Sequence, residues 1–356
     1  MKKTILSFLI IGIVCLIKVN AQNPVTTLQH NGATQVYYGQ SSFSDALGAA
    51  VNGDTLVLSA GFFTAPTSIS KGVKVYGSGH FPDSANIPKR TTIMSGLSIN
   101  AGADSLRLEG LFINGDINYD ANNSINYVSI IRCRLGSALF NSTSVTASKN
   151  NCSYEECFIE GGINFFYYGD YLLIKNCIIA GSVGVTYNGY NTITSSIALI
   201  NGNAFIDKNI FINNDGYFRH FLSNISSSYV TNNIIFNPNI FYGSNEGNFI
   251  NNNIFIQPSL NLGNNSASNN YFGVPQSSIF VNQTGNTIDY SHNYHLQNPS
   301  LYLGTDGTQV GIYGGTTPFK EKGAASNPQI TNRNIATQTD VNGNLQINVS
   351  VKAQDR

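Results

Sequence analysis

The sequence predicts an all-β solenoid, in which short strands stack in successive coils along one axis. One observation is a segment that recurs through the central chain: a small or polar residue, an apolar pair and then turn residues. Its interval averages about twenty residues, which suits one coil of short strands and turns. A second observation is that no clear helical periodicity follows residue 51. The recurring residues are Cys133, Cys157, Cys177, Ser196, Asn209, Asn233, Asn253, Asn270 and Asn293, with Gly110 at the same position earlier in the chain.

Stacked coils would align these residues in one ladder, because neighbouring strands lie about 4.8 Å apart. An asparagine ladder is stable when each amide hydrogen-bonds to the amides above and below it and to turn backbone. Cysteines at the same position, Cys133, Cys157 and Cys177, are expected to be buried and inert. We favour free thiols because parallel Cβ vectors are poorly aimed for a disulfide, with a Cys157–Cys177 bond as the alternative. Cys152 falls outside the ladder and is expected to react sooner.

Residues 1–21 have the pattern of a signal peptide. A basic pair at 2–3 precedes an apolar run over 5–17, and "VNA" at 19–21 places small residues where a signal peptidase cleaves. We therefore expect export, with the periplasm, the cell surface and the extracellular space all left open. No later stretch is apolar enough to cross a bilayer, which predicts no integral membrane span after cleavage.

Residues 22–53 are predicted to cap the first coil. Apolar residues at helical spacing from Phe43 to Val51 predict a short amphipathic helix, which would cover the core and the unpaired strand edge at this end. The stretch "FSDALGAAVNGDTLVLSAGFF" (43–63), with "ISKGVKVYGSG" (69–79) after it, resembles exported bacterial proteins of the pectate-lyase-like superfamily. The resemblance implies a right-handed parallel β-helix over 54–315. It implies no particular chemistry, because this fold hosts lyases, hydrolases, adhesins and non-catalytic proteins.

Residues 316–356 are predicted to form a C-terminal cap over the last coil. "LQINVSVKA" (345–353) alternates apolar and polar residues, as a half-buried strand does. The Gly-rich segment before the cap, "GTDGTQVGIYGG" (304–315), is similar to a closing motif of exported bacterial β-helix proteins. Within it, Asp306 is a candidate Ca²⁺ ligand, although its position favours a carboxylate that caps its own turn.

Composition and charge restrict the partners and the chemistry. Charged residues make up 11% of the chain, against about 25% in an average protein, and the formal net charge is zero. Without a basic excess, nucleic acid is not an expected partner, and no metal-binding motif implies a cofactor beyond Ca²⁺. The catalytic sets of polygalacturonases and calcium-dependent pectate lyases are not found, nor is a nucleophile elbow. The weak catalytic candidates are Arg219, His220 and Asp215, while Lys175 and Lys208 are expected to be solvated strand residues.

Aromatic residues in the turns are more informative. Tyr168, Tyr187, Tyr217 and Tyr242 come before successive ladder strands, so they are expected to share one side of the solenoid. There they would form a shallow groove whose ring faces stack on sugar C–H groups. The alternative is that these rings fill corners of the core, where large aromatic side chains are common.

These observations predict an exported protein that contacts a polysaccharide as a binding or surface protein, without a recognisable catalytic set. One alternative is a polysaccharide lyase or glycoside hydrolase that acts on a polyuronate or another polymer near Arg219 and His220. The other is a structural or adhesive rod with no glycan ligand. Charge discriminates between them, because a lyase needs a base and groups that neutralise uronate carboxylates. The sequence leaves the oligomeric state and the identity of the ligand open.

Overall fold

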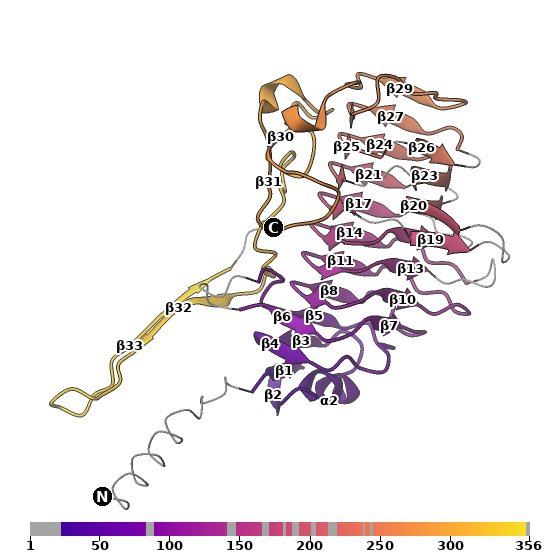
Figure 1. The fold of residues 1–356 in the computed structure, drawn as a ribbon. Helices are drawn as coiled ribbons and strands as arrows, with labels where there is room; N and C mark the ends of the chain where they lie inside the picture. The colour runs from indigo at the N-terminus through magenta and orange to yellow at the C-terminus, as the bar shows by residue number, and fades with distance from the viewer. Residues whose placement is uncertain are drawn as a thin grey trace, which may run out of the picture.

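The computed structural model describes residues 23–353 apart from 83–88, 141–146, 166–170, 181–182, 187–191, 201–203, 213–218, 238 and 243–244. Three mainly parallel sheets run along one axis and enclose an apolar core (Figure 1). The predicted all-β solenoid is confirmed, and parallel pairing between successive coils makes it a parallel β-helix. Within the described residues, α2 (Ser42–Ala49) is the only α-helix, and no helix is long and apolar enough to cross a bilayer.

Sheet A runs the length of the solenoid and contains twelve of the described strands. Its first two strands pair antiparallel, whereas from β3 onward each coil adds one parallel strand in register. In sheet order the strands are β2 (Ala33–Tyr38), β1 (Val25–His30), β3 (Thr55–Leu58), β5 (Lys74–Tyr76), β8 (Arg107–Glu109), β11 (Ser129–Ile131), β14 (Ser153–Glu155), β17 (Leu173–Lys175), β21 (Phe205–Asp207), β24 (Tyr229–Thr231), β27 (Phe249–Asn251) and β29 (Ser266–Ser268).

Sheets B and C close the other two sides of the coil. Sheet B contains β4 (Gly61–Phe63), β6 (Thr91–Ile93), β9 (Phe112–Ile113), β12 (Arg134–Leu135), β15 (Phe158–Ile159), β18 (Ile178–Ile179), β22 (Ile210–Phe211), β25 (Ile234–Ile235) and β28 (Ile254–Phe255). Sheet C contains β7 (Leu97–Ile99), β10 (Ile117–Tyr119), β13 (Ala138–Phe140), β16 (Ile163–Phe165), β20 (Thr192–Ile200), β23 (Arg219–Ile225) and β26 (Asn239–Tyr242), with β19 (Val183–Thr186) paired antiparallel to β20.

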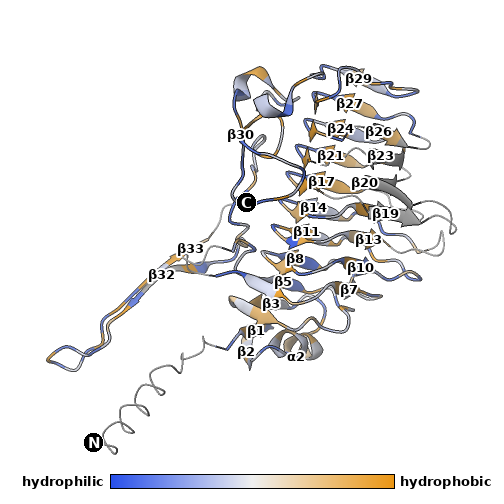
Figure 2. Ribbon diagram, in the orientation of Figure 1, coloured by the Kyte–Doolittle hydropathy of each residue, from blue (hydrophilic) through white to orange (hydrophobic). Residues whose placement is uncertain are grey.

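The core is built from residues that recur at one position in every coil, and hydrophobic residues accordingly repeat along the stacked strands (Figure 2). Side chains alternate along a strand, so one residue of each short strand points inward. Burying such a side chain stabilises the fold by roughly 1.5–3 kcal/mol. In sheet A these residues are at most 1% exposed: Leu56, Val75, Leu108, Ile130, Tyr154, Ile174, Ile206, Val230 and Ile250.

The N-terminal end of the core is closed by α2, as predicted. Phe43 and Leu47 lie one turn apart on the helix and are both buried in the core. At the end of the helix, Lys71 Nζ donates hydrogen bonds to the carbonyl oxygens of Leu47 (2.8 Å) and Ala50 (2.6 Å). The ammonium group thus satisfies carbonyls that the helix itself leaves without partners.

The C-terminal end is closed differently from the prediction. Residues 256–265 join β28 to β29 without forming a strand of sheet C, and their Leu260 and Leu262 pack against the end of the core. Residues 316–329, expected over the last coil, lie beside the early coils instead. Gln329 Nε2 donates to the carbonyl oxygen of Gly77 (3.1 Å).

Residues 274–326, here called the strap, run back along the outer face of sheet B (Figure 1). The strap contains η1 (Gln276–Ser278), β30 (Phe280–Asn282), β31 (Asn293–Leu296) and η2 (Pro299–Leu301). Sheet B needs this cover because its outer row is apolar: Phe158, Ile178, Ile210, Ile234 and Ile254. The strap supplies apolar partners to this row, among them Phe280, Tyr294, Val310, Ile312 and Phe319.

After the strap, β32 (Gln329–Ile335) and β33 (Ile347–Lys352) form an antiparallel hairpin that projects from the solenoid (Figure 1). The strand predicted over 345–353 is therefore present. The half-burial predicted for it is not, because Ile347, Val349 and Val351 are 56%, 48% and 61% exposed. The alternating pattern predicted the strand correctly, but no described residues pack against its apolar face and bury it.

The predicted ladder is present at the corner between sheets A and B, with three corrections. Ser196 lies in β20 of sheet C and Asn293 in β31 of the strap, so neither belongs to the ladder. Gly110 comes one residue before the ladder, whose position in that coil is held by Leu111. Ser196 was assigned to the ladder because the antiparallel pair β19–β20 lengthens its coil, in which 32 residues separate Cys177 from Asn209. The ladder is Leu111, Cys133, Cys157, Cys177, Asn209, Asn233, Asn253 and Asn270.

Asn233 shows how the amides connect the coils. Its Oδ1 accepts hydrogen bonds from the backbone N (2.9 Å) and the Nδ2 (3.0 Å) of Asn209. Its own backbone N and Nδ2 donate to Asn253 Oδ1 (2.9 and 3.0 Å), and Nδ2 also donates to the Ile206 carbonyl oxygen (2.8 Å). One fully buried side chain therefore joins three coils and leaves none of its polar atoms unpaired.

The ladder cysteines use the same carbonyl groups as the amides. Cys157 Sγ donates to the Ile130 carbonyl oxygen and Cys177 Sγ to that of Tyr154, each at 3.3 Å. These carbonyls occupy the position that Ile206 occupies for Asn233. The thiol is thus a small, mostly apolar substitute for the amide, and the cysteines that the structure describes are free.

Cys152 differs from the prediction, because it is as buried as the ladder cysteines. It lies at the corner between sheets C and A and is 1% exposed. Burial raises the pKa of its thiol to about 12. A buried thiol that stays protonated is a poor nucleophile, so Cys152 has no reason to react first.

We predict that replacing Asn233 with Ala lowers the free energy of unfolding by at least about 3 kcal/mol, since each buried group left without a partner costs about 1–3 kcal/mol. Urea denaturation measures the loss. Asn264→Ala, in an exposed side chain of the last coil, is the control and should change stability by less than about 0.5 kcal/mol. Equal losses in the two variants would contradict the ladder's role.

We also predict that iodoacetamide modifies none of Cys133, Cys152, Cys157 and Cys177 in the native protein and all four after denaturation in urea. The reason is that burial keeps the thiols protonated and inaccessible. Peptide mass spectrometry reads the labelling. Rapid native labelling of Cys152, or a Cys157–Cys177 disulfide, would show that the thiols are placed differently.

Candidate functional site

Only part of the predicted site falls within the described residues. Tyr168, Tyr187, Tyr217 and Asp215 lie outside the described residues. Arg219 and His220 begin β23, and Tyr242 ends β26, the neighbouring strand of sheet C. In the register of this pair, His220 is opposite Asn239 and Tyr242 is opposite Ser223. The backbone therefore places His220 and Tyr242 at opposite ends of the strand pair.

Asp306 caps its own turn. Its Oδ1 accepts hydrogen bonds from the backbone N (3.0 Å) and the Oγ1 (2.8 Å) of Thr308, and from Lys208 Nζ (3.1 Å). Burial alone would raise the pKa of this carboxyl, but the donors from Thr308 and Lys208 hold it below its usual value. Within the described residues no three His, Cys, Asp or Glu side chains cluster as metal ligands would.

Lys208 is buried, contrary to the prediction that it is a solvated strand residue. Its side chain lies under the Gly-rich segment 304–315 of the strap. A Cβ at Gly314 would come 3.0 Å from Lys208 Nζ and 1.9 Å from the Gln309 carbonyl oxygen. The glycine is therefore required by the Gln309 carbonyl group of the strap's own turn, and the lysine ammonium group lies close by on the other side.

Lys208 belongs to a row of residues that precede the ladder and adopt left-handed backbone conformations. This turn row consists of Gly110, Arg132, Glu156, Asn176, Lys208, Asn232, Asn252 and Asn269. Asn and Gly are common at positive φ, whereas Arg, Glu and Lys are not, so surrounding contacts must hold the latter there.

Side chains of the turn row bind the strap. Asn176 Nδ2 donates to the Ile312 carbonyl oxygen (2.6 Å), and Asn252 Nδ2 donates to that of Leu303 (3.0 Å). Between them, Asn232 Oδ1 accepts from the backbone N of Thr305 (2.8 Å). The polar turns of successive coils thus hydrogen-bond the backbone of a distant segment.

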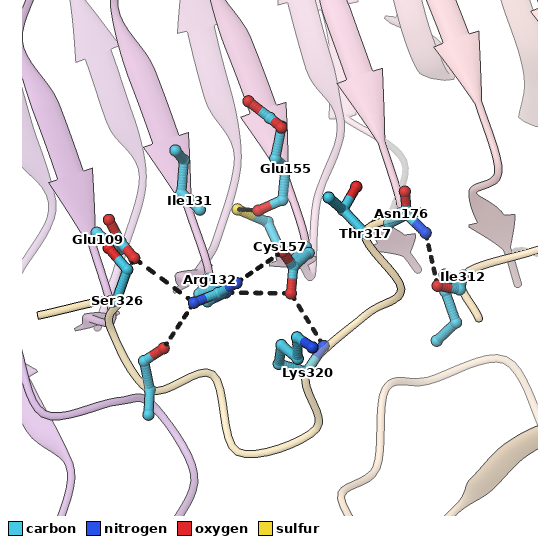
Figure 3. Close-up of polar contacts among 12 residues, drawn as sticks. Glu109, Ile131, Arg132, Glu155, Cys157, Asn176, Ile312, Thr317, Lys320 and Ser326 are labelled. Atoms are coloured by element: carbon cyan, nitrogen blue, oxygen red, sulfur yellow. Dashed lines mark hydrogen bonds and ion pairs between the residues drawn. The ribbon is translucent and has the colours of Figure 1, made fainter. Parts of the chain in front are cut away.

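Arg132 lies at the centre of the contacts that attach the last part of the strap, from Lys320 to Ser326, to the solenoid (Figure 3). Its guanidinium is 2% exposed and lies between two carboxylates, with Nε 3.1 Å from Glu156 Oε2 and Nη1 3.7 Å from Glu109 Oε1. The same carboxylates accept backbone N–H groups of the strap, from Lys320 (3.0 Å) and Ser326 (2.6 Å). Burial raises the pKa of the Glu156 carboxyl, against the lowering effect of Arg132. These buried charges hold the strap in place.

An exposed aromatic stack on sheet A is the strongest candidate for a binding site. Phe205, Tyr229 and Phe249 begin β21, β24 and β27 and are 45%, 42% and 44% exposed. Successive ring centroids are 5.1 Å apart, with interplanar angles of 3° and 13°. Carbon atoms in contact are only about 3.5–4.0 Å apart, so the rings are offset and part of each face stays open. The next residue of the row, Ser266, is too small to cover Phe249.

A polar row runs beside the aromatic stack. Asp207, Thr231 and Asn251 follow the three rings by two residues, which places them on the same outer face of the sheet. Thr231 Oγ1 donates to Asp207 Oδ1 (2.9 Å), and Asn251 Oδ1 accepts from Ser268 N and Oγ (both 2.9 Å). The face therefore combines a narrow apolar strip with parallel carboxylate, hydroxyl and amide groups.

Sequence reasoning missed this stack, although a signal for it was present. Phe205, Tyr229 and Phe249 each come four residues before a ladder asparagine, so one offset from the ladder identifies all three. The prediction instead used aromatic residues of the turns, whose distances from the ladder vary. A fixed offset is what aligns side chains across coils.

A scan against protein-family models finds no match for this chain, and searches of curated proteins and of solved structures find none either. The parallel β-solenoid is established by the chain's own strand order and register. Its function has to be inferred from the surfaces that this fold presents.

We predict that Arg132→Met lowers the free energy of unfolding by about 3–5 kcal/mol, because it leaves Glu109 and Glu156 buried without their cation. Chemical denaturation of the full chain measures this. Lys74→Met is the control, because Lys74 is an exposed residue of β5 in sheet A. It should leave the free energy of unfolding nearly unchanged. A small effect for Arg132→Met would mean that the strap does not depend on this ion-pair cluster.

Proposed function

We propose that this protein is an exported β-helix of the pectate-lyase-like type that binds an extended polysaccharide along the outer face of sheet A. The signal-peptide pattern of residues 1–21 supports export, and the resemblance over 43–79 supports the family type. The single observation that carries the binding proposal is the exposed stack of Phe205, Tyr229 and Phe249.

The chemistry of the face suits a sugar chain. Pyranose rings have apolar C–H faces that pack on aromatic rings, and hydroxyl edges that need hydrogen-bond partners. The stack offers the first contact and the row of Asp207, Thr231 and Asn251 offers the second. Each coil advances the row by about 4.8 Å, close to the length of one sugar residue in an extended chain, so a long polymer would make the same contact on successive coils.

Binding, with no chemical step, is the activity that we assign. The strongest charge cluster among the described residues, Arg132 with Glu109 and Glu156, is buried and attaches the strap. Lys208 is likewise paired with Asp306 beneath the strap. Groups committed in this way are not available to remove or deliver a proton to a substrate on the surface.

We predict that Tyr229→Ala weakens retention in polysaccharide gels three- to tenfold, since one aromatic contact contributes roughly 0.5–1.5 kcal/mol. Native affinity electrophoresis with a panel of neutral and uronate polymers measures this, together with the thermal midpoint. Phe62→Ala removes another exposed ring, from sheet B, and is the matched control. Unchanged retention of Tyr229→Ala and Phe249→Ala on every polymer that the wild type binds would place the binding surface elsewhere.

A further inference from the structure

The charges around the aromatic stack restrict the class of polymer that it fits. A polyuronate carries a carboxylate on every sugar, so its binding site needs cations that face the chain. A neutral polysaccharide needs none and depends on ring contacts and hydroxyl partners instead. The two classes therefore make opposite demands on the same surface.

Two of the three cations near the stack contact the strap, and the third belongs to a strand of another sheet. From Tyr171 to Ser268 the sequence contains three, Lys175, Lys208 and Arg219. Lys208 Nζ is buried beneath the strap with Asp306 (3.1 Å), and Lys175 Nζ donates to Thr317 Oγ1 of the strap (3.3 Å). Arg219 lies in β23, a strand of sheet C, and so on another side of the coil.

A carboxylate, by contrast, is fixed beside the stack. Asp207 follows Phe205 by two residues in β21. Its Oδ1 accepts hydrogen bonds from Thr231 Oγ1 (2.9 Å) and Asn232 Nδ2 (2.7 Å), which hold the group in the polar row. A uronate lying on the rings would meet this negative charge. The nearest cation of the same outer row is Lys175, opposite Asp207 in the β17–β21 register, and its ammonium group donates to Thr317 Oγ1 of the strap.

We infer that the polymer bound by the stack is a neutral polysaccharide, and that Asp207 discriminates against uronates. This inference rests on the proposed function and specifies its ligand. The carboxylate accepts hydrogen bonds from the hydroxyl groups of an uncharged sugar, while Thr231 and Asn251 continue the row with neutral groups suited to the same hydroxyls. Like-charge repulsion supplies the selectivity against the anionic polymer.

The test compares hydroxyethyl cellulose with polygalacturonate as soluble probes for the mature protein in affinity electrophoresis, at low and high salt. We expect at least tenfold tighter binding of the neutral polymer, with little dependence on salt. Asp207→Asn removes the charge and keeps an oxygen for both hydrogen bonds. It should narrow the preference for hydroxyethyl cellulose severalfold at low salt, because polygalacturonate binding rises with loss of the repulsion while an amide accepts sugar hydroxyl groups less strongly than a carboxylate.

The outcomes separate the inference from the proposed function. Tighter binding of polygalacturonate that is lost in Phe249→Ala would overturn the inference and leave the stack as the binding site. Equal binding of both polymers by the wild type and by Asp207→Asn would also overturn it, because the carboxylate would then not discriminate. Binding of no polymer in the panel, the two probes included, would overturn both.

Discussion

The hydrogen-bonded ladder at the corner between sheets A and B is the interaction on which the rest of the structure depends. Strands of two or three residues make few backbone hydrogen bonds, so pairing alone specifies the register of a coil weakly. Asn233 adds a fixed connection, because its amide binds Asn209 on one side, Asn253 on the other and a buried carbonyl group as well. Once the corners are aligned, every outer row is aligned too, including the aromatic stack.

The turn row lies next to the ladder, repeats once per coil as the ladder does, and attaches the strap to the solenoid. A left-handed residue follows each strand of sheet A from β8 to β29. In six coils its side chain binds the strap that covers sheet B: Arg132, Glu156, Asn176, Lys208, Asn232 and Asn252. Buried ion pairs such as Arg132 with Glu156 are weak evidence for stability but specify position well, because only one placement of the strap satisfies them. The charges of Arg132, Glu109 and Glu156 are thus committed to the fold. At its later coils, the outer face of sheet A carries the aromatic stack beside a row of carboxylate, hydroxyl and amide groups.

Much of the fold could be predicted from the sequence, because it depends on local repetition. The strand segments, the asparagine ladder and the capping helix all follow from spacing and polarity. What could not be predicted depends on contacts between distant residues: Lys208 and Asp306 are 98 residues apart, and Glu156 and Lys320 are 164 apart. Because the position of the strap could not be predicted, Lys208 was expected to be solvated. The exposed stack was not predicted, because the sequence argument looked for aromatic residues in turns of variable length, where repetition does not fix position.

The central claim, that the ladder holds the coils in register, is tested most directly by hydrogen exchange at single-residue resolution. The backbone amides of Asn209, Asn233 and Asn253 donate to side-chain oxygens of the next coil. We expect these amides to exchange only through global unfolding, orders of magnitude more slowly than those of the exposed β32–β33 hairpin. Exchange of the three ladder amides as fast as that of the hairpin would contradict the account.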